Sequence, residues 1–198
     1  MALRDSTRRL FADTIQKMME KESLDRIRVK DLCRLCGADR QTFYYHFRDK
    51  YDLIAWIYAG DYSRALESTE GAYSLDHAAA ILEEMWRKRT FYRKAFTDKS
   101  QNAVSRYIYS YYVELGTEAV RSRLGPEALT AEALYDIRSH AFACLGHTIE
   151  WLEGKNSYSP AELARLQYRS MPPVLKDGYG IPREAGLRPE ETEERRQK

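Results

Sequence analysis

One stretch constrains this chain more than any other: residues 26–53, which read RIRVKDLCRLCGADRQTFYYHFRDKYDL. Its first part gives a short helix one apolar face, formed by Val29, Leu32, Cys33 and Cys36. Gly37 suits the left-handed conformation that ends a helix, and Asp39 suits the position that caps the next one. Two short helices joined by a tight turn that contains glycine are typical of a helix-turn-helix motif.

The second predicted helix, residues 40–47, carries hydrogen-bonding groups on its outer side. Phe43 and Phe47 lie four positions apart and share the inner face. The outer side bears guanidinium, amide, hydroxyl and imidazole groups: Arg40, Gln41, Thr42, Tyr44, Tyr45 and His46. Arg and Gln suit base edges in the major groove, while hydroxyls and amides suit phosphates. The alternative is a core helix with a solvated outer face, but the glycine turn and the density of donors favour a DNA-reading helix.

This stretch resembles the DNA-binding end of the TetR family of bacterial transcriptional regulators. The matching positions keep one register: Ile27, Val29, Leu32, Gly37, Thr42, Phe43, Tyr44, His46, Phe47, Lys50 and Leu53. The segment RQTFYYHFRDKYDLIAWIY is similar, more narrowly, to the branch that contains regulators of dihydroxyacetone kinase operons. Members of the family often have Thr or Ser where this chain has Arg28, at the start of the first helix of the motif. The side-chain cap of that helix is therefore lost, but the positive charge of Arg28 can still attract a phosphate.

The resemblance implies a homodimer that binds a palindromic operator in double-stranded DNA, with an affinity modulated by an effector. The implied DNA contacts are Arg28, Arg40, Gln41, Thr42, Tyr44, Tyr45, His46 and Lys50. Lys50 is included because the positive end of a helix dipole would assist its approach to a phosphate. The family's dimer interface corresponds here to two predicted helices, residues 130–153 and 159–171.

The remaining sequence also predicts helices. A first helix over residues 5–22 would complete a three-helix unit, and apolar spacing predicts further helices over 50–68, 76–94, 102–123, 130–153 and 159–171. No stretch shows a strand-like alternation of any length. We therefore expect an all-α protein, in which a three-helix helix-turn-helix head (1–50) is joined to a larger helical effector-binding and dimerisation body (51–175). Residues 176–198 are charge-rich and poor in apolar residues, which predicts a mobile tail.

The effector could be a small molecule or a protein, and aromatic residues of the body are the candidates for contacting it. They are Trp86, Phe91, Tyr92, Tyr107, Tyr111, Phe142 and His147. Aromatic residues at helical spacing are more often ordinary core, and an exposed cluster could instead bind a regulatory protein. Several buried phenols, however, need hydrogen-bond partners that a ligand or water can supply.

Composition and motifs exclude several other classes. Residues 1–50 hold 12 Lys and Arg against 8 Asp and Glu, while the remainder holds 20 against 22, so the basic excess lies with the helix-turn-helix. No apolar run is long enough to span a membrane and no secretory signal is visible, which predicts a cytoplasmic protein. Three cysteines include one CxxC without a second ligand pair, so we expect neither a metal nor a cofactor. No catalytic motif argues for an enzyme; a protein-interaction adaptor that retains the fold is the remaining alternative.

Overall fold

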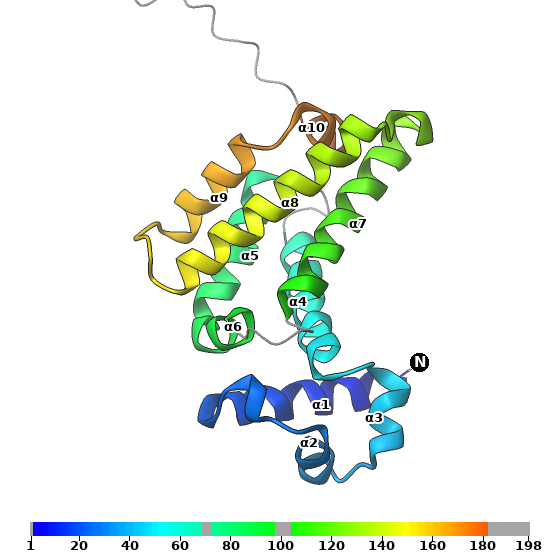
Figure 1. Cartoon of the computed structure of the whole chain (residues 1–198), viewed down its shortest axis with the longest axis vertical. Coiled ribbons are helices and arrows are strands. Elements are labelled where there is room, and N and C mark those ends of the chain that lie inside the picture. Colours follow the sequence, from blue (N-terminus) through cyan, green and yellow to red (C-terminus); the bar gives the residue numbers. More distant parts are fainter. Residues whose placement is uncertain (1, 69–72, 98–103, 182–198) are drawn as a thin grey trace, which may run out of the picture.

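The computed structural model describes residues 2–68, 73–97 and 104–181, with side chains from residue 6 onward (Figure 1). Every regular element in this part of the chain is a helix, which confirms the predicted all-α fold. A small head contains α1 (Ala2–Lys21), the 3-10 turn η1 (Leu24–Arg26), α2 (Val29–Cys36) and α3 (Arg40–His46). Helix α4 (Lys50–Glu67) leads from the head into a larger body (Figure 1).

The body is built from helices that pack on one another beyond α4. Its elements are α5 (Leu75–Arg87), α6 (Arg89–Phe96), α7 (Val104–Leu124), η2 (Pro126–Ala128), α8 (Ala131–Leu152), α9 (Pro160–Arg169) and α10 (Pro173–Tyr179). Helix α5 packs on α9, and α7 packs on α4, α8 and α10. None of the described helices has the length and apolarity that crossing a lipid bilayer demands.

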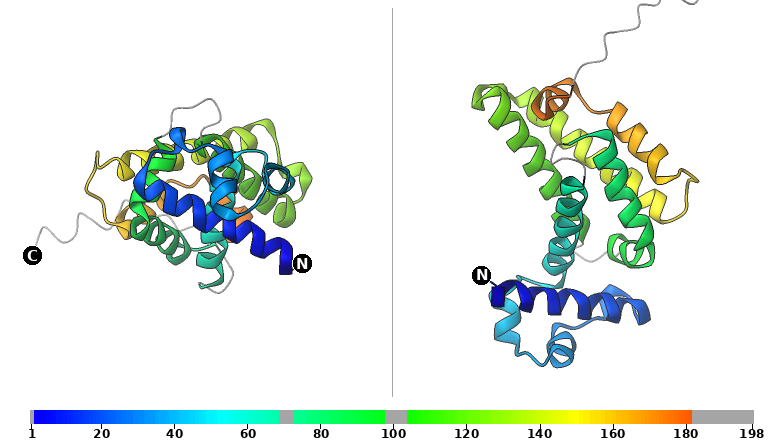
Figure 2. Two further views of the ribbon diagram at one scale, coloured as in Figure 1. Left: turned by 90° about the horizontal axis from the view of Figure 1, so that it is seen from below. Right: turned by 180° about the vertical axis from the view of Figure 1, so that it is seen from behind.

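Aromatic packing holds the head together. Phe11 on α1 meets Phe43 on α3 edge to face, with ring centroids 5.3 Å apart, and Phe47 adds a second edge contact with Phe11 at 6.5 Å. Edge-to-face pairs of this kind are favourable beyond the area that they bury. Helix α1 therefore lies across the helix-turn-helix and closes the three-helix unit that the sequence predicted (Figure 2, right).

The prediction of one helix over residues 76–94 is wrong, because the chain turns at Lys88 between α5 and α6. The cause is a buried carboxylate on α4. Asp61 is 1% exposed and accepts hydrogen bonds from the Lys88 ammonium, at 2.9 Å, and from the Tyr92 hydroxyl. Arg64 also pairs with Asp61. The break at Lys88 brings Lys88 and Tyr92 to a buried charge that Arg64, on the same helix, would otherwise pair alone. A buried charge with too few partners is costly.

The segment expected to be a tail begins in a packed helix. Residues 176–179 belong to α10, which starts with Pro173 and ends at Gly180 in the left-handed conformation (φ 71°). Leu175 is buried, and a Cβ on Gly178 would lie within 3.1 Å of backbone and side-chain atoms of Val120. A Cβ on Gly180 would likewise meet the Arg123 side chain on α7. The absence of side chains at Gly178 and Gly180 thus lets α10 approach α7 closely. The rest of the expected tail, residues 182–198, lies outside the described residues.

Candidate nucleic-acid interface and body pocket

The turn between α2 and α3 has the geometry that the sequence predicted. Gly37 lies at φ 62°, ψ 27°, and its N–H bonds back to the last turn of α2. The Asp39 side chain caps α3 by accepting from the Thr42 N–H over 2.6 Å. These bonds from Thr42 lower the pKa of the Asp39 carboxyl. The N-cap position of α2 is occupied by Arg28, whose side chain makes no capping hydrogen bond.

Most side chains on the outer face of α3 are exposed to solvent, and α3 lies at the side of the head, beside the N-terminal end of α1 (Figure 1). Tyr44 is 49% exposed and Tyr45 66% exposed. Arg40 and Gln41 are exposed too, and the Arg40 guanidinium lies 5.8 Å from the centroid of the Tyr44 ring. The predicted contacts Thr42 and His46 are half-buried at the edges of this face, and Arg28 is exposed at the start of α2. Exposed tyrosines beside cationic and amide groups form a surface suited to a polar partner.

Lys50 has a different place from the one expected. Its ammonium donates to three backbone carbonyls, those of Leu24 at 2.6 Å, Ile27 at 2.9 Å and Asp25 at 3.2 Å. A cation among carbonyls at the end of a helical turn satisfies their unpaired acceptors. Lys50 thereby ties the start of α4 to the turn that precedes α2, and it acts within the fold of the head.

In the described part of the chain, side chains of α7 and α6 donate hydrogen bonds to the head. The Tyr107 hydroxyl on α7 donates to Asp49 Oδ2 over 2.9 Å, while Asp49 Oδ1 caps α4. Burial, and then the bond to Asp49, raises the pKa of Tyr107 to about 12. The Lys94 ammonium on α6 donates to carbonyls at the end of α1, those of Met19 at 2.5 Å and Glu20 at 3.2 Å. The head is therefore held by α7 at one point and by α6 at another.

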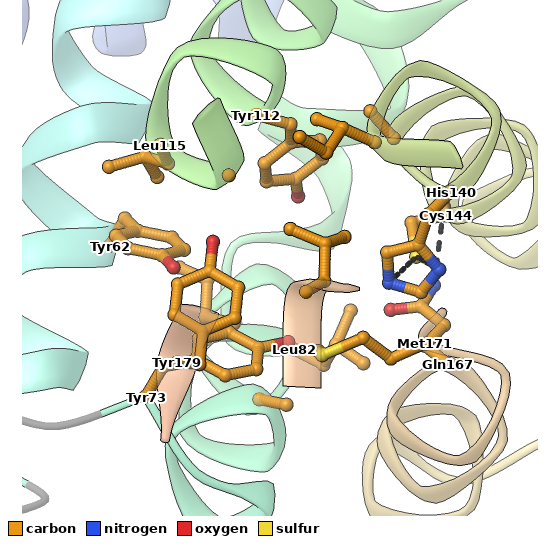
Figure 3. A pocket seen from close by; sticks show the side chains of 16 residues that line it. Tyr62, Tyr73, Leu82, Tyr112, Leu115, His140, Cys144, Gln167, Met171 and Tyr179 are labelled. Atoms are coloured by element: carbon orange, nitrogen blue, oxygen red, sulfur yellow. Dashed lines mark hydrogen bonds between the residues drawn. The ribbon is translucent and has the colours of Figure 1, made fainter. Parts of the chain in front are cut away.

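The body contains a cavity of about 70 Å³ between α4, α5, α7, α8, α9 and α10. Its polar lining residues are Tyr62, Tyr73, Tyr112, His140, Cys144, Gln167 and Tyr179. Its other lining residues are Ala78, Ile81, Leu82, Leu115, Gly116, Ile137, Ala141, Met171 and Leu175. The four phenols surround one side, and His140, Cys144 and Gln167 form the other (Figure 3).

Hydrogen bonds fix several of the polar groups around this cavity. The Gln167 amide nitrogen donates to the Cys144 carbonyl at 3.2 Å and to Thr148 Oγ1 at 3.1 Å. His140 Nε2 lies 3.5 Å from Cys144 Sγ. The Tyr112 hydroxyl is hydrogen bonded to the Tyr58 hydroxyl on α4. One wall of the cavity is thus connected directly to the helix that leads to the head.

None of the seven aromatic and histidine residues predicted to bind an effector lines this cavity. The structure does not bring them together at one place, and their contact with an effector stays a prediction. Trp86 stacks on Trp151, with centroids 5.0 Å apart, and Phe91 and Tyr92 are buried in the core. Tyr107 bonds to Asp49, and Tyr111 packs its ring edgewise on Tyr58 and Tyr62. Phe142 and His147 lie on the exposed face of α8. The cavity lining comes from six helices and from Tyr73 and Met171 between helices, so no spacing within one helix could reveal it.

That exposed face of α8 is unusually aromatic. Tyr135 is 71% exposed and Phe142 is 72% exposed, and both lie two turns apart on the same side of the helix. The same side carries exposed Ala143 and Gly146, and a Cβ on Gly146 would meet nothing within 4 Å. Large apolar rings beside small residues form a surface onto which another helix can pack closely.

The part of the chain that the structure describes contains no cluster of metal-ligating side chains. No three His, Cys, Asp or Glu side chains there gather closely enough to hold an ion. Cys33 is buried and Cys36 half-buried on the inner side of α2, as the helical spacing predicted. Burial raises the pKa of both thiols, which disfavours the thiolate that a metal needs.

Comparisons with known proteins agree with this architecture. The chain is similar to the HTH-type dhaKLM operon transcriptional activator DhaS of Lactococcus lactis subsp. lactis (strain IL1403), with 24% identity over 91 residues. That alignment covers 46% of this chain and 49% of the relative, so the chain spans about half the length of the curated relative it matches. The solved structure of a dihydroxyacetone kinase operon activator DhaS has the same fold, with a TM-score of 0.50 and 18% identity over 90% of this chain and 98% of that one.

A family model gives the assignment. The TetR C-terminal model described as "Transcriptional regulator C-terminal region" matches residues 74–172, which is half of the chain and nearly all of the body from α5 to the end of α9. The helix-turn-helix head in front of that region has the spacing of the same family, and the resemblance expected from residues 26–53 is confirmed. The chain belongs to the TetR family of transcriptional regulators.

Proposed function

We propose that this protein is a cytoplasmic, homodimeric transcriptional regulator that binds an inverted repeat in double-stranded DNA through α3. A molecule bound in the body modulates its affinity for that DNA. The observation that carries the proposal is the exposed outer face of α3, which follows the Gly37 turn in a chain of the TetR family. Its relatives are transcriptional regulators, and we assign the chain no catalytic role.

We assign the exposed residues of α3 to two kinds of DNA contact, with base edges and with phosphates. Arg40 and Gln41 stand in its first turn, which enters the major groove in helix-turn-helix proteins, and we assign them to base edges. The hydroxyls of Tyr44 and Tyr45, with Thr42 and His46 at the edges, are assigned to phosphates. Arg28 adds a charge contact at the start of α2. Lys50 is left out of this set, because its ammonium is used within the head.

The dimer is proposed to form through α8 and α9. A single exposed face with two aromatic rings and with small residues at 143 and 146 supports a second copy packing against it. A two-fold axis there pairs each patch with itself and sets the two α3 helices on one side of the assembly. Half-sites one helical turn apart in DNA then match the symmetry of the protein.

Modulation by an effector is supported by the connections of α7. The same helix places Tyr112 and Gly116 at the cavity and Tyr107 against Asp49 at the end of the head. Tyr112 also bonds to Tyr58 on α4. A molecule that prefers one arrangement of α7 and α4 shifts the population of head orientations, and DNA affinity follows. The cavity lies between helices of the body, and its small volume favours a small molecule over the protein partner that was the alternative.

The test is selection of bound sequences from a random duplex pool, followed by affinity measurements at several salt concentrations. We expect an inverted repeat with half-sites about 10 base pairs apart and an affinity that falls steeply as salt rises. Arg40→Ala is the test variant. Arg87→Ala, an exposed arginine on α5, is the matched control. Loss of base preference at one position of each half-site with Arg40→Ala alone supports the proposal, whereas base preferences that are equal in all three proteins contradict the assignment of α3.

A further inference from the structure

Among the residues that the structure describes, none with a charged side chain lines the body cavity. Its lining includes phenols, an imidazole, a thiol and an amide, and the rest is aliphatic. No Lys, Arg, Asp or Glu is among the sixteen lining residues, although charged residues make up 31% of the chain. An ion that entered would lose its hydration without gaining a counter-charge, and such burial is strongly unfavourable.

Its titratable groups are also held in their uncharged forms near neutral pH. Burial lowers the pKa of His140 to about 4, and it raises the pKa of Cys144 to about 12. The pKa of Tyr179 is raised to about 12, first by burial. At pH 7 these pKa values leave both His140 and Cys144 uncharged, so neither side chain supplies a standing counter-charge for a charged ligand.

Uncharged hydrogen-bonding groups nevertheless face the space from both sides. Because the Gln167 amide nitrogen is occupied by Cys144 and Thr148, the side chain is fixed with its oxygen directed toward the cavity (Figure 3). Opposite it stand the phenols, which can donate as well as accept. Leu82, Leu115 and Met171 supply apolar contacts between the two sides.

We infer that this cavity binds a small uncharged molecule that has an aliphatic body and at least one hydrogen-bonding group, such as an alcohol, amide or ketone. The volume of about 70 Å³ limits its size. It is below the roughly 150 Å³ of an engineered cavity that holds benzene. A short chain of a few heavy atoms fits, and a larger ring system requires the walls to move.

This inference deepens the proposed function by naming the ligand class of its effector site. Binding is measured on the full chain without DNA, so failure here is distinguishable from failure to bind an operator. Two isosteric pairs serve as probes, butyramide with butyrate and 1-butanol with butylammonium. The members of each pair match in size and differ in charge.

The readout is the methyl resonance of Met171 in protein labelled with ¹³C at methionine methyl groups, titrated with each probe at pH 7. We expect saturable shifts with butyramide and 1-butanol, and binding at least about tenfold weaker with butyrate and butylammonium. Equal or tighter binding of either ion overturns the inference. So does the lack of a saturable shift with all four probes, because the cavity would then be only a packing gap.

Substitutions that fill the cavity test whether the neutral probes bind there. Ala141→Leu projects into the space, and we expect it to abolish the shifts caused by the neutral probes. Ala131→Leu, at the exposed start of α8, is the matched control and should leave them unchanged. Leu115→Phe fills the cavity from α7 and keeps the test decisive if Ala141→Leu does not fold. Binding that survives in a folded filling variant places the probes elsewhere and contradicts the inference.

Discussion

The hydroxyl of Tyr107 donates to Asp49 over 2.9 Å, so a residue of the body bonds to the residue that caps the first helix leaving the head. We expect Tyr107→Phe to lower the free energy of unfolding by about 1–2 kcal/mol, because the lost bond has an ionised acceptor. Asp49→Asn keeps a capping oxygen, and the double variant should show a coupling energy of about 1 kcal/mol. Urea unfolding of the four proteins measures this coupling. Additive effects would show that the two residues act independently.

Lys50 is expected to stabilise the head and to leave DNA contacts to other residues. Lys50→Met removes the donor to three carbonyls, and we expect a loss of about 2 kcal/mol in stability. Amide exchange in residues 24–29 should accelerate. Lys30→Met, at an exposed position on α2, is the matched control and should change stability by less than about 0.5 kcal/mol. If Lys50→Met weakens DNA binding with no change in stability, the lysine contacts phosphate after all.

Substitutions of base-contacting and phosphate-contacting residues of α3 should have different effects on DNA binding. Arg40→Ala or Gln41→Ala should relax base preference at one position of each half-site, with discrimination falling by about 1–3 kcal/mol. Tyr44→Ala should instead weaken binding to all sequences by a similar factor. Affinities of each variant for the selected site and for its single-base substitutions decide between the two patterns. Equal binding by Tyr44→Ala and the parent would exclude the phosphate assignment of Tyr44.

The aromatic face of α8 should control association between two copies. Phe142→Arg places a charge at a residue that is 72% exposed, and we expect it to weaken dimerisation by about 2 kcal/mol or more. Sedimentation equilibrium over a range of protein concentrations measures the effect. Leu35→Arg changes another exposed apolar residue, on α2, and should leave the dimer intact. A dimer that tolerates Phe142→Arg but not Leu35→Arg would move the interface to the head.

His140 should make the protein labile to acid. Its pKa is about 4 in the folded chain and has an ordinary value of 6.5, so the unfolded state takes up the proton first as pH falls. The stability that this group contributes is present above pH 6.5 and is lost between pH 6.5 and 4, to a total of about 3 kcal/mol at most. His140→Gln should remove that part of the pH dependence, while His147→Gln provides a control on the solvent face of α8. Identical pH profiles for the parent and His140→Gln would show that the ring is solvated in the fold.

Local features of the head could be predicted from sequence because they depend on neighbouring residues. The left-handed turn at Gly37 and the cap at Asp39 are each formed within four positions, and both have the expected geometry. The break at Lys88 could not be foreseen, because its cause is Asp61 on another helix. The hydrogen bonds of Lys50 could not be foreseen either, because its carbonyl partners come from residues 24–27, more than twenty positions earlier in the chain. The sequence alone therefore indicated a contact with DNA. The DNA contacts of α3 themselves stay a prediction.

The residues that line the cavity could not be predicted from the sequence. A dense run of aromatic residues indicates burial, but it does not tell which rings line an empty space and which fill the core. Tyr111 packs into the core while its neighbour Tyr112 faces the cavity. Tyr179 reaches the same space only because Gly178 lets α10 come close to Val120. Arrangements of this kind are decided by packing between distant segments.

The cavity walls run from Tyr62 to Tyr179, so a bound molecule would touch segments from most of the length of the body at once. Such a molecule binds only the folded chain, and at a concentration a hundred times its dissociation constant it would add about 2.7 kcal/mol to stability. A marginally stable regulator unfolds and is degraded more slowly when it is stabilised in this way. The effector would therefore govern how long each copy of the regulator survives in the cell, in addition to how tightly that copy holds DNA.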